Sequence, residues 1–178
     1  MKNYLSIILS TTLFSCSSIE VQETNTEVVE IDENIKFISY LDNDWQKNLD
    51  ENPLFASYVG DKRSNDKINS NSINQFNEER QSEIDSLNQL YEIDQSKLNE
   101  ENKLNFKLKE FGLKSNIGLT DFPIYYLRLN QRGGIQSFYE TGNRLVYNSK
   151  DDYVDWLSRL KQFPANIINS LEINKEGL

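Results

Sequence analysis

The side chains of this sequence exclude most enzyme chemistry, because the chain contains no histidine. A Ser-His-Asp triad or a Cys-His pair therefore cannot be assembled. A typical zinc site also lacks its nitrogen ligands, and Cys16 is the only cysteine. The 28 Asp and Glu residues could supply an acid/base pair, but so many carboxylates place some pairs together by chance. We predict no catalytic residue, no metal site and no cofactor in this chain.

A glycine-rich turn is the first candidate for binding. Gly133 and Gly134 follow Arg132, and such a turn could hold an anion through backbone amides and the guanidinium. It lacks the Lys-Ser/Thr pair of a phosphate loop and the spacing of a dinucleotide site, which favours a plain turn. Four aromatic residues nearby could line a sugar or peptide groove, although core or interface packing is the more frequent role: Tyr125, Tyr126, Phe138 and Tyr139.

The acidic balance of the chain argues against nucleic acid as a partner. The sequence has 19 basic residues against 28 acidic ones, a formal net charge of -9, and its basic residues are scattered. Binding to phosphates requires clustered basic side chains that displace counterions. We therefore expect no nucleic-acid partner and assign the charge to solubility.

The N-terminus carries the pattern of an export signal. Lys2 precedes an apolar run over residues 5–14, which is shorter than the roughly 20 residues that span a bilayer. The run ends in Leu13-Phe14-Ser15-Cys16, which resembles the bacterial lipobox. That resemblance implies cleavage after residues 1–15, diacylglycerol on the Cys16 thiol, and a second acyl chain such as palmitate that makes the anchor stable. The alternative is an ordinary signal peptide with a chance cysteine.

The address of the mature chain follows from the lipobox. We expect an exported lipoprotein of the bacterial cell envelope, held at the membrane by its lipid. Ser17 after the cysteine favours the outer membrane, with the protein facing the periplasm. Residues 16–35 are predicted to form an extended tether, since they hold six carboxylates and no Lys or Arg.

The body of the chain, from residue 36 to residue 178, has the pattern of a mainly α domain. Apolar residues at three- and four-residue steps predict helices over residues 35–49, 54–59, 72–91 and 99–113. Ser72, with Gln75 three residues later, predicts a capping box, and Asn99 predicts another N-cap. The helices over 72–91 and 99–113 are expected to form an antiparallel pair. On the first helix, one predicted face holds Ile38, Leu41, Trp45 and Leu49.

The second half of the body is less regular in sequence. Residues 121–148 predict an extended or loop segment with turns at Gly133-Gly134 and at Gly142-Asn143. Ser149 is predicted to cap a helix over residues 150–162. Phe163-Pro164 predicts a corner, after which a last helix begins at Pro164. The predicted buried face of the helix over 150–162 holds Tyr153, Trp156, Leu157 and Leu160. We expect an irregular helical array that is a fragment of a larger helical domain.

The body resembles the bacterial domain of unknown function 885 family through four stretches in the family's order. These are a Trp-containing helix followed by Pro-x-x-Ala-x-x-x-Gly-Asp over 45–61, an Ile-Asp helix junction over 93–99, an Asn-Gln-x-Gly-Gly turn over 129–134, and Asp-Tyr-x-x-Trp-Leu-x-Arg-Leu with Phe-Pro over 152–164. Full members of the family are longer and carry a C-terminal His-Glu-x-x-x-Gly-His-His-like segment, which resembles gluzincin-type zinc metallopeptidases. This chain has no counterpart of those His residues.

The resemblance implies that the chain is the N-terminal helical part of such a protein, and that zinc belongs only to the missing C-terminal part. A peptide is the implied substrate of the full-length protein, whereas this chain alone is expected to be inactive. The implied cleft residues are Asn130, Gln131, Gly133 and Gly134, since a Gly-Gly turn lets backbone approach a substrate closely.

Two functions stay open on this sequence. The first is the N-terminal fragment of a lipid-anchored, metallopeptidase-like envelope protein that lacks the metal-binding motif. The second is a standalone envelope lipoprotein that acts as a binding or structural module. An in-frame continuation carrying the His-rich motif would separate them.

Overall fold

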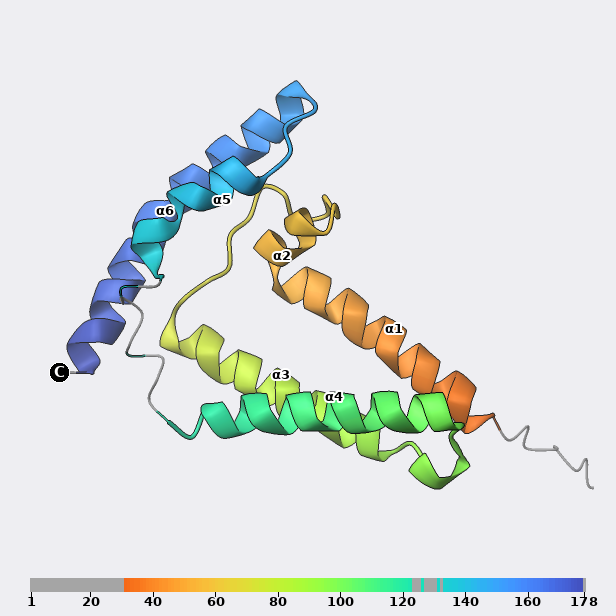
Figure 1. Ribbon diagram of the computed structural model, residues 1–178. Coiled ribbons are helices and arrows are strands. Elements are labelled where there is room, and N and C mark those ends of the chain that lie inside the picture. Colours follow the sequence, from red (N-terminus) through yellow and green to blue (C-terminus); the bar gives the residue numbers. More distant parts are fainter. Residues whose placement is uncertain (1–30, 123–125, 127–130, 132, 178) are drawn as a thin grey trace, which may run out of the picture. The chain divides into compact units, whose positions relative to one another are not determined.

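The computed structural model describes residues 31–122, 126, 131 and 133–177. Helix is the main element over these residues, so the predicted mainly α fold is confirmed (Figure 1). The helices that carry the argument below are α1 Glu33–Glu51, α2 Pro53–Tyr58, α3 Ile73–Tyr91, η1 Gln95–Lys97, α4 Glu100–Leu119, η3 Ile135–Ser137, α5 Tyr139–Arg144 and α6 Lys150–Glu176. Within the described ranges, none of the helices combines the length and hydropathy needed to cross a bilayer.

Helix starts follow the capping residues of the sequence. The Ser72 Oγ accepts a hydrogen bond from the Gln75 backbone N–H (3.1 Å), and the Asn99 Oδ1 accepts one from Asn102 N–H (2.8 Å). At Ser149 the capping box is complete, because the Asp152 side chain also accepts a hydrogen bond from the Ser149 backbone N–H (2.9 Å). The predicted N-caps are therefore confirmed. The capping box predicted at Ser72 is wrong, because the reciprocal pair of bonds forms at Ser149 instead.

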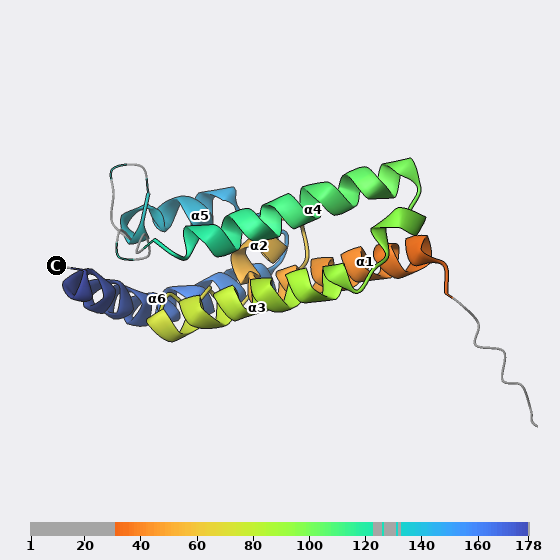
Figure 2. The same cartoon turned by 90° about the horizontal axis from the view of Figure 1, so that it is seen from below.

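The core lies where α1 meets α3, η1 and α4. The helices α3 and α4 run antiparallel and contact each other, as predicted (Figures 1 and 2). Phe37 and Phe106 place their ring centroids 6.0 Å apart, and the Tyr40 hydroxyl donates to the Ser86 carbonyl (3.1 Å). The buried members of this core are Phe37, Tyr40, Leu90, Ile93, Leu98, Phe106 and Leu113.

The predicted face of α1 is only partly the buried one. Leu49 is buried and Leu41 packs against the core, but Ile38 and Trp45 are 46% and 44% exposed. The core uses Phe37 instead, because α1 carries apolar residues on two neighbouring stripes. Three- and four-residue spacing identifies both stripes and does not say which one faces inward.

Two predictions about the second half of the chain are wrong. Pro164 does not begin a helix, since α6 continues through it from Lys150 to Glu176. Proline removes one intrahelical hydrogen bond, and a helix of 27 residues keeps its path despite that loss. Gly142 and Asn143 do not form a turn either, because both lie inside α5.

Gly142 is required by packing rather than by a turn. An added Cβ at this position would lie 2.6 Å from Cζ2 of Trp156, so α5 approaches α6 more closely than alanine allows. We expect Gly142→Ala to lower the free energy of unfolding by about 1–3 kcal/mol through overpacking. Gly112→Ala on α4 is the matched control, since nothing lies within 4 Å of its added Cβ. There the better helix propensity of alanine should stabilise by up to about 1 kcal/mol. Urea unfolding measures both, and equal effects would contradict the close approach.

Candidate functional site

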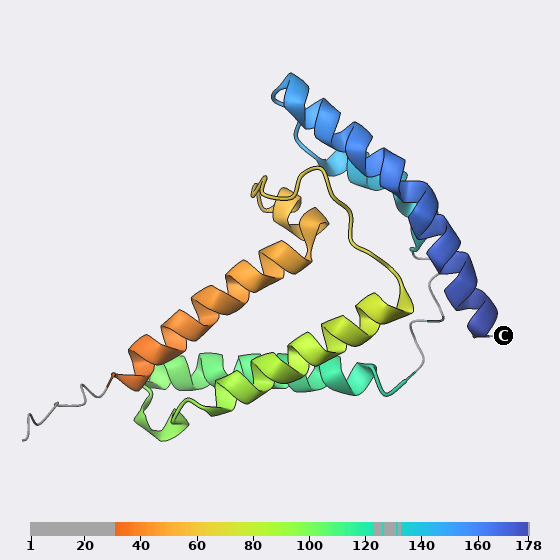
Figure 3. The ribbon, with the colours of Figure 1, turned by 180° about the vertical axis from the view of Figure 1, so that it is seen from behind.

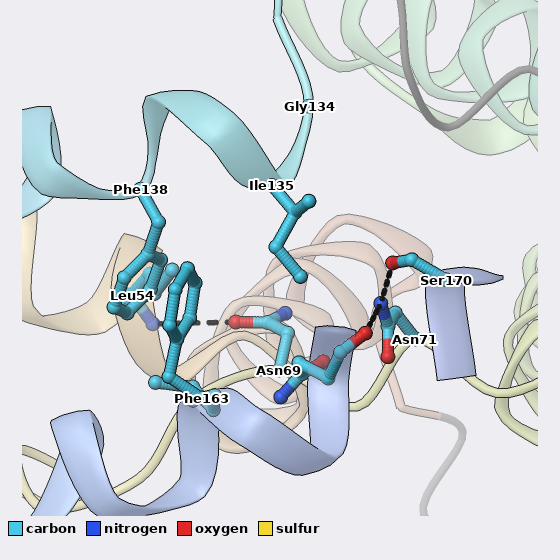
Figure 4. A pocket seen from close by; sticks show the side chains of 10 residues that line it. Leu54, Asn69, Asn71, Gly134, Ile135, Phe138, Phe163 and Ser170 are labelled. Carbon is cyan, nitrogen blue, oxygen red and sulfur yellow. Dashed lines mark hydrogen bonds between the residues drawn. The ribbon is translucent and has the colours of Figure 1, made fainter. Parts of the chain in front are cut away.

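A cavity of about 240 Å³ lies between α2, the segment that joins α2 to α3, η3 and α6 (Figure 4). We name it the amide cavity, because asparagine side chains form one of its walls. None of its lining residues carries an ionisable side chain, so it offers no charged acid or base to activate the Ser170 hydroxyl. The lining residues are Leu54, Ile68, Asn69, Asn71, Gly134, Ile135, Phe138, Phe163, Asn166 and Ser170.

The apolar wall of the amide cavity is an aromatic stack. Phe138 stacks on Phe163 with ring centroids 4.4 Å apart, and on Trp156 at 5.6 Å. Figure 4 shows Phe138 and Phe163 side by side, with the Ile135 side chain descending beside them from η3. Stacked rings with little rotamer freedom make this wall rigid, and the wall suits an apolar group.

The polar wall of the amide cavity is formed by Asn69 and Asn71, and hydrogen bonds to neighbouring residues hold both side chains in place. Asn69 donates to the Asn52 Oδ1 (3.0 Å) and accepts from the Leu54 backbone N–H (3.5 Å). The Asn71 Nδ2 donates to the Ser170 Oγ (2.6 Å) and to the Asn166 carbonyl (2.9 Å). The Asn71 Oδ1 is buried without a hydrogen-bond partner among the described residues. The cavity thus joins an apolar aromatic wall to a wall of neutral amide side chains, which suits an uncharged, largely apolar group.

The predicted cleft residues reach this cavity through one member. Gly134 lines it, and its φ of 138° belongs to the region that favours glycine. Gly133 is half-buried and Gln131 is exposed, without lining the cavity. Asn130 and Cys16 lie outside the described residues. Neither the cleft role of the turn nor the lipid on Cys16 is tested by these positions.

The described aromatic candidates do not line the amide cavity together. Phe138 is in the aromatic stack, whereas Tyr139, next to it, is 68% exposed. Tyr126 is half-buried, and Tyr125 lies outside the described residues. Sequence reasoning missed Asn69 and Asn71, because the polar segment 61–71 has the composition of a plain surface loop.

The segment between α2 and α3 is yellow in Figure 3. Arg159 on α6 binds this segment through hydrogen bonds. Only 1% of Arg159 is exposed. Its Nε donates to the Lys67 carbonyl (2.7 Å), and its Nη2 donates to the Ser57 Oγ (2.6 Å). Nη2 also reaches the carbonyls of Pro53 (3.2 Å) and Ser64 (3.1 Å). One guanidinium therefore sets the position of the chain that carries Asn69 and Asn71.

A second ionic contact joins the same segment to the start of α6. Lys62 donates to the Asp152 Oδ1, and the Asp152 Oδ2 accepts from the backbone N–H groups of Asn148 and Ser149 (2.9 Å each). These donors, that of Lys62 first, lower the pKa of Asp152 from its ordinary 3.8 to about 2.

A pH dependence follows from this lowered pKa. Because the folded-state value lies below 3.8, the Asp152 contacts stabilise the fold above about pH 4, and this stabilisation is lost as the pH falls toward 2. We expect Asp152→Asn to be less stable than wild type at pH 7. The difference in unfolding midpoint should shrink between about pH 4 and pH 2, as followed by circular dichroism in urea. A difference that does not change with pH would contradict the assignment.

Within the described ranges, no group of three or more Asp, Glu, His or Cys side chains is placed to hold a metal ion. Comparison of the chain with protein families, curated proteins and solved structures gives no match. The resemblance to the domain of unknown function 885 family therefore rests on the sequence motifs alone.

Proposed function

We propose that the chain is the N-terminal helical part of a lipid-anchored, metallopeptidase-like envelope protein, supplying packing and cleft surfaces rather than the catalytic centre. One observation carries this proposal: α6 leaves an apolar stripe exposed, while the stripe that it buries contains polar and charged side chains beside apolar ones.

The inward stripe of α6 recurs every three or four residues and contains Asp152, Arg159, Ser170 and Ile173, which are 5%, 1%, 3% and 2% exposed. The neighbouring stripe, offset by one residue, holds Tyr153, Leu157 and Leu160 of the face that the sequence predicts to be buried, whereas Trp156 of that face is half-buried and stacks on Phe138. We name the neighbouring stripe the α6 stripe, and its members are 56%, 55%, 41%, 56% and 49% exposed: Tyr153, Leu157, Leu160, Ile168 and Leu171.

An exposed apolar stripe of this length favours a helix that packs on something further. Covering apolar surface stabilises by about 25 cal/mol per Å², and scattered exposed residues would not share one helical face. A similar stripe on α4 includes Leu104, Leu108 and Phe111, at 58%, 59% and 71% exposure. In the proposed protein, the remaining part of the same polypeptide covers these stripes and carries the zinc. The peptide substrate belongs to that whole protein.

The second candidate, a standalone envelope lipoprotein that binds a ligand, is favoured by the amide cavity. An aromatic wall facing a few neutral amide side chains is the composition typical of a site for a small, uncharged ligand. In that case the α6 stripe has no covering polypeptide.

Cysteine labelling separates the two candidates, because these 178 residues contain one cysteine, Cys16, and the unsubstituted protein gives the background labelling. Leu157→Cys reports on the α6 stripe, and Glu100→Cys, whose native side chain is 92% exposed, is the control. We expect a maleimide to label both variants of the purified chain rapidly. In envelope fractions that hold the native protein, Leu157→Cys should be protected while Glu100→Cys still reacts. Equal reaction of the two in the envelope would reject the covered stripe and favour the standalone module.

The lipid anchor makes a separate prediction. Replacing Cys16 by Ala should abolish incorporation of labelled palmitate and move the protein from the detergent phase to the aqueous phase, since the thiol that takes the lipid is gone. Ser17→Ala is the control and should keep both properties. Palmitate incorporation into the alanine variant equal to that of wild type would contradict lipidation at Cys16.

A further inference from the structure

A second cavity, of about 290 Å³, lies between the end of α2, the segment before α6, and α6 itself. We name it the Arg159 cavity. One part of its wall is cationic, through Arg159 and Lys62, and another part is apolar, through Leu145, Val146 and Trp156. The remaining lining residues are Ser57, Tyr58, Gly60, Asn65, Tyr147, Asn148 and Asp152.

Arg159 is a buried cation without a carboxylate partner. Its four hydrogen-bond acceptors are three backbone carbonyls and the Ser57 hydroxyl, all of them neutral. None of the ion pairs among the described residues includes Arg159, and its Nη1 donates no hydrogen bond there. Burial lowers the pKa of this guanidinium, and Asp155 and Asp66 oppose that effect only through longer-range attraction. Buried charges are ordinarily paired, so an anion in the cavity would complete this one.

The carboxylate that lines the cavity is already committed elsewhere. Asp152 accepts from Lys62 through Oδ1, and from Ser149 Oγ (3.0 Å) and two backbone N–H groups through Oδ2. It therefore does not neutralise Arg159. Its negative charge on the same wall disfavours a dianion such as phosphate and leaves room for a single negative charge.

We propose that the Arg159 cavity binds a monoanionic carboxylate attached to a small apolar group. The carboxylate lies at Nη1 of Arg159, and its apolar body packs on Val146, Leu145 and Trp156. The cavity is near the lower end of the size range of ligand sites, which limits the body to about one amino-acid side chain. Both an apolar C-terminal residue of a peptide and a short aliphatic acid have this chemistry.

Binding is measured by isothermal titration calorimetry on the full chain in detergent micelles. N-acetyl-leucine represents a peptide C-terminus and hexanoate represents an aliphatic acid, while N-acetyl-leucine amide removes the charge. We expect saturable binding of the acid and at least about tenfold weaker binding of the amide. Tighter binding of N-acetyl-leucine than of hexanoate assigns the site to peptide termini, and the reverse order assigns it to aliphatic acids.

The test variant leaves the Arg159 hydrogen bonds intact. Val146 lines the cavity and is 71% exposed, so we expect its replacement to leave the fold unchanged, as circular dichroism of each variant checks. Val146→Asp should weaken binding of the acid at least about tenfold, because the two negative charges repel each other. Val146→Asn has a side chain shaped like that of Asp but neutral, and it should keep most of the affinity for the acid. The proposal is overturned if no carboxylate binds saturably, if the amide binds as tightly as the acid, if inorganic phosphate displaces N-acetyl-leucine at equal concentration, or if both Val146 variants weaken binding equally.

Discussion

Replacing Arg159 by Ala is expected to lower the free energy of unfolding by roughly 3–5 kcal/mol, because a hydrogen bond to a charged group contributes about 1.5–3 kcal/mol and several such bonds do not add fully. The guanidinium satisfies the Lys67, Pro53 and Ser64 carbonyls and the Ser57 hydroxyl. An alanine would remove the Arg159 donor of the Lys67 carbonyl, whereas the Ser64 and Pro53 carbonyls would keep hydrogen bonds from the Lys67 N–H (3.1 Å) and the Ser57 Oγ (3.0 Å). A buried acceptor left without a donor costs about 1–3 kcal/mol. The segment between α2 and α3 would then keep its contacts to α6 through Lys62, Asn71 and Gln162, but would lose the buried one.

Urea unfolding at neutral pH measures this loss, and Arg144→Ala is the matched control. Arg144 has a side chain that is 67% exposed and forms an ion pair one helical turn away with Glu140. Its removal should change stability by no more than about 0.5 kcal/mol. A loss below about 1 kcal/mol for Arg159→Ala would mean that the Arg159 hydrogen bonds do not hold the segment between α2 and α3 against α6.

Replacing Phe37 by Ala is expected to destabilise the chain by about 3–5 kcal/mol, through lost transfer energy and the cavity that remains. Phe37 is 0% exposed and stacks on Tyr40 while contacting Phe106, so it joins α1 to α4 at the centre of the core.

Phe111→Ala on α4 is the control for this second change, since 71% of Phe111 is exposed. In the isolated chain we expect its effect to stay within about 0.5 kcal/mol. Both variants are compared by urea unfolding with circular dichroism detection. A similar loss of stability for the two variants would contradict this, because it would mean that Phe111 is as buried as Phe37.

Helix positions in this protein could be predicted from local chemistry. Ser72, Asn99 and Ser149 each satisfy backbone N–H groups within three residues, so the signal and its effect lie in the same short segment. Helix faces were harder, because α6 carries two neighbouring stripes and buries the one that contains Arg159. Hydrophobic periodicity selects the apolar stripe, and here hydrogen bonding to a distant segment decides the orientation instead.

The candidate site depends on contacts that no local pattern contains. Asn71 bonds Ser170 across 99 positions, and Arg159 bonds Ser57 across 102. Gly134 was recognisable, because a Gly-Gly turn is a local signal. At Gly142 the sequence predicts a turn, whereas the structure requires glycine there because the Trp156 ring of another helix lies so close.

The mass of the native protein tests the central proposal most directly. An antibody raised against α4, Glu100–Leu119, can recover the protein from envelope fractions for intact mass spectrometry. A helical part of a larger lipid-anchored protein predicts a mass well above the 20.8 kDa of this chain, with acyl groups on the peptide that begins at Cys16. A mass equal to residues 16–178 plus lipid would contradict it and leave the standalone lipoprotein.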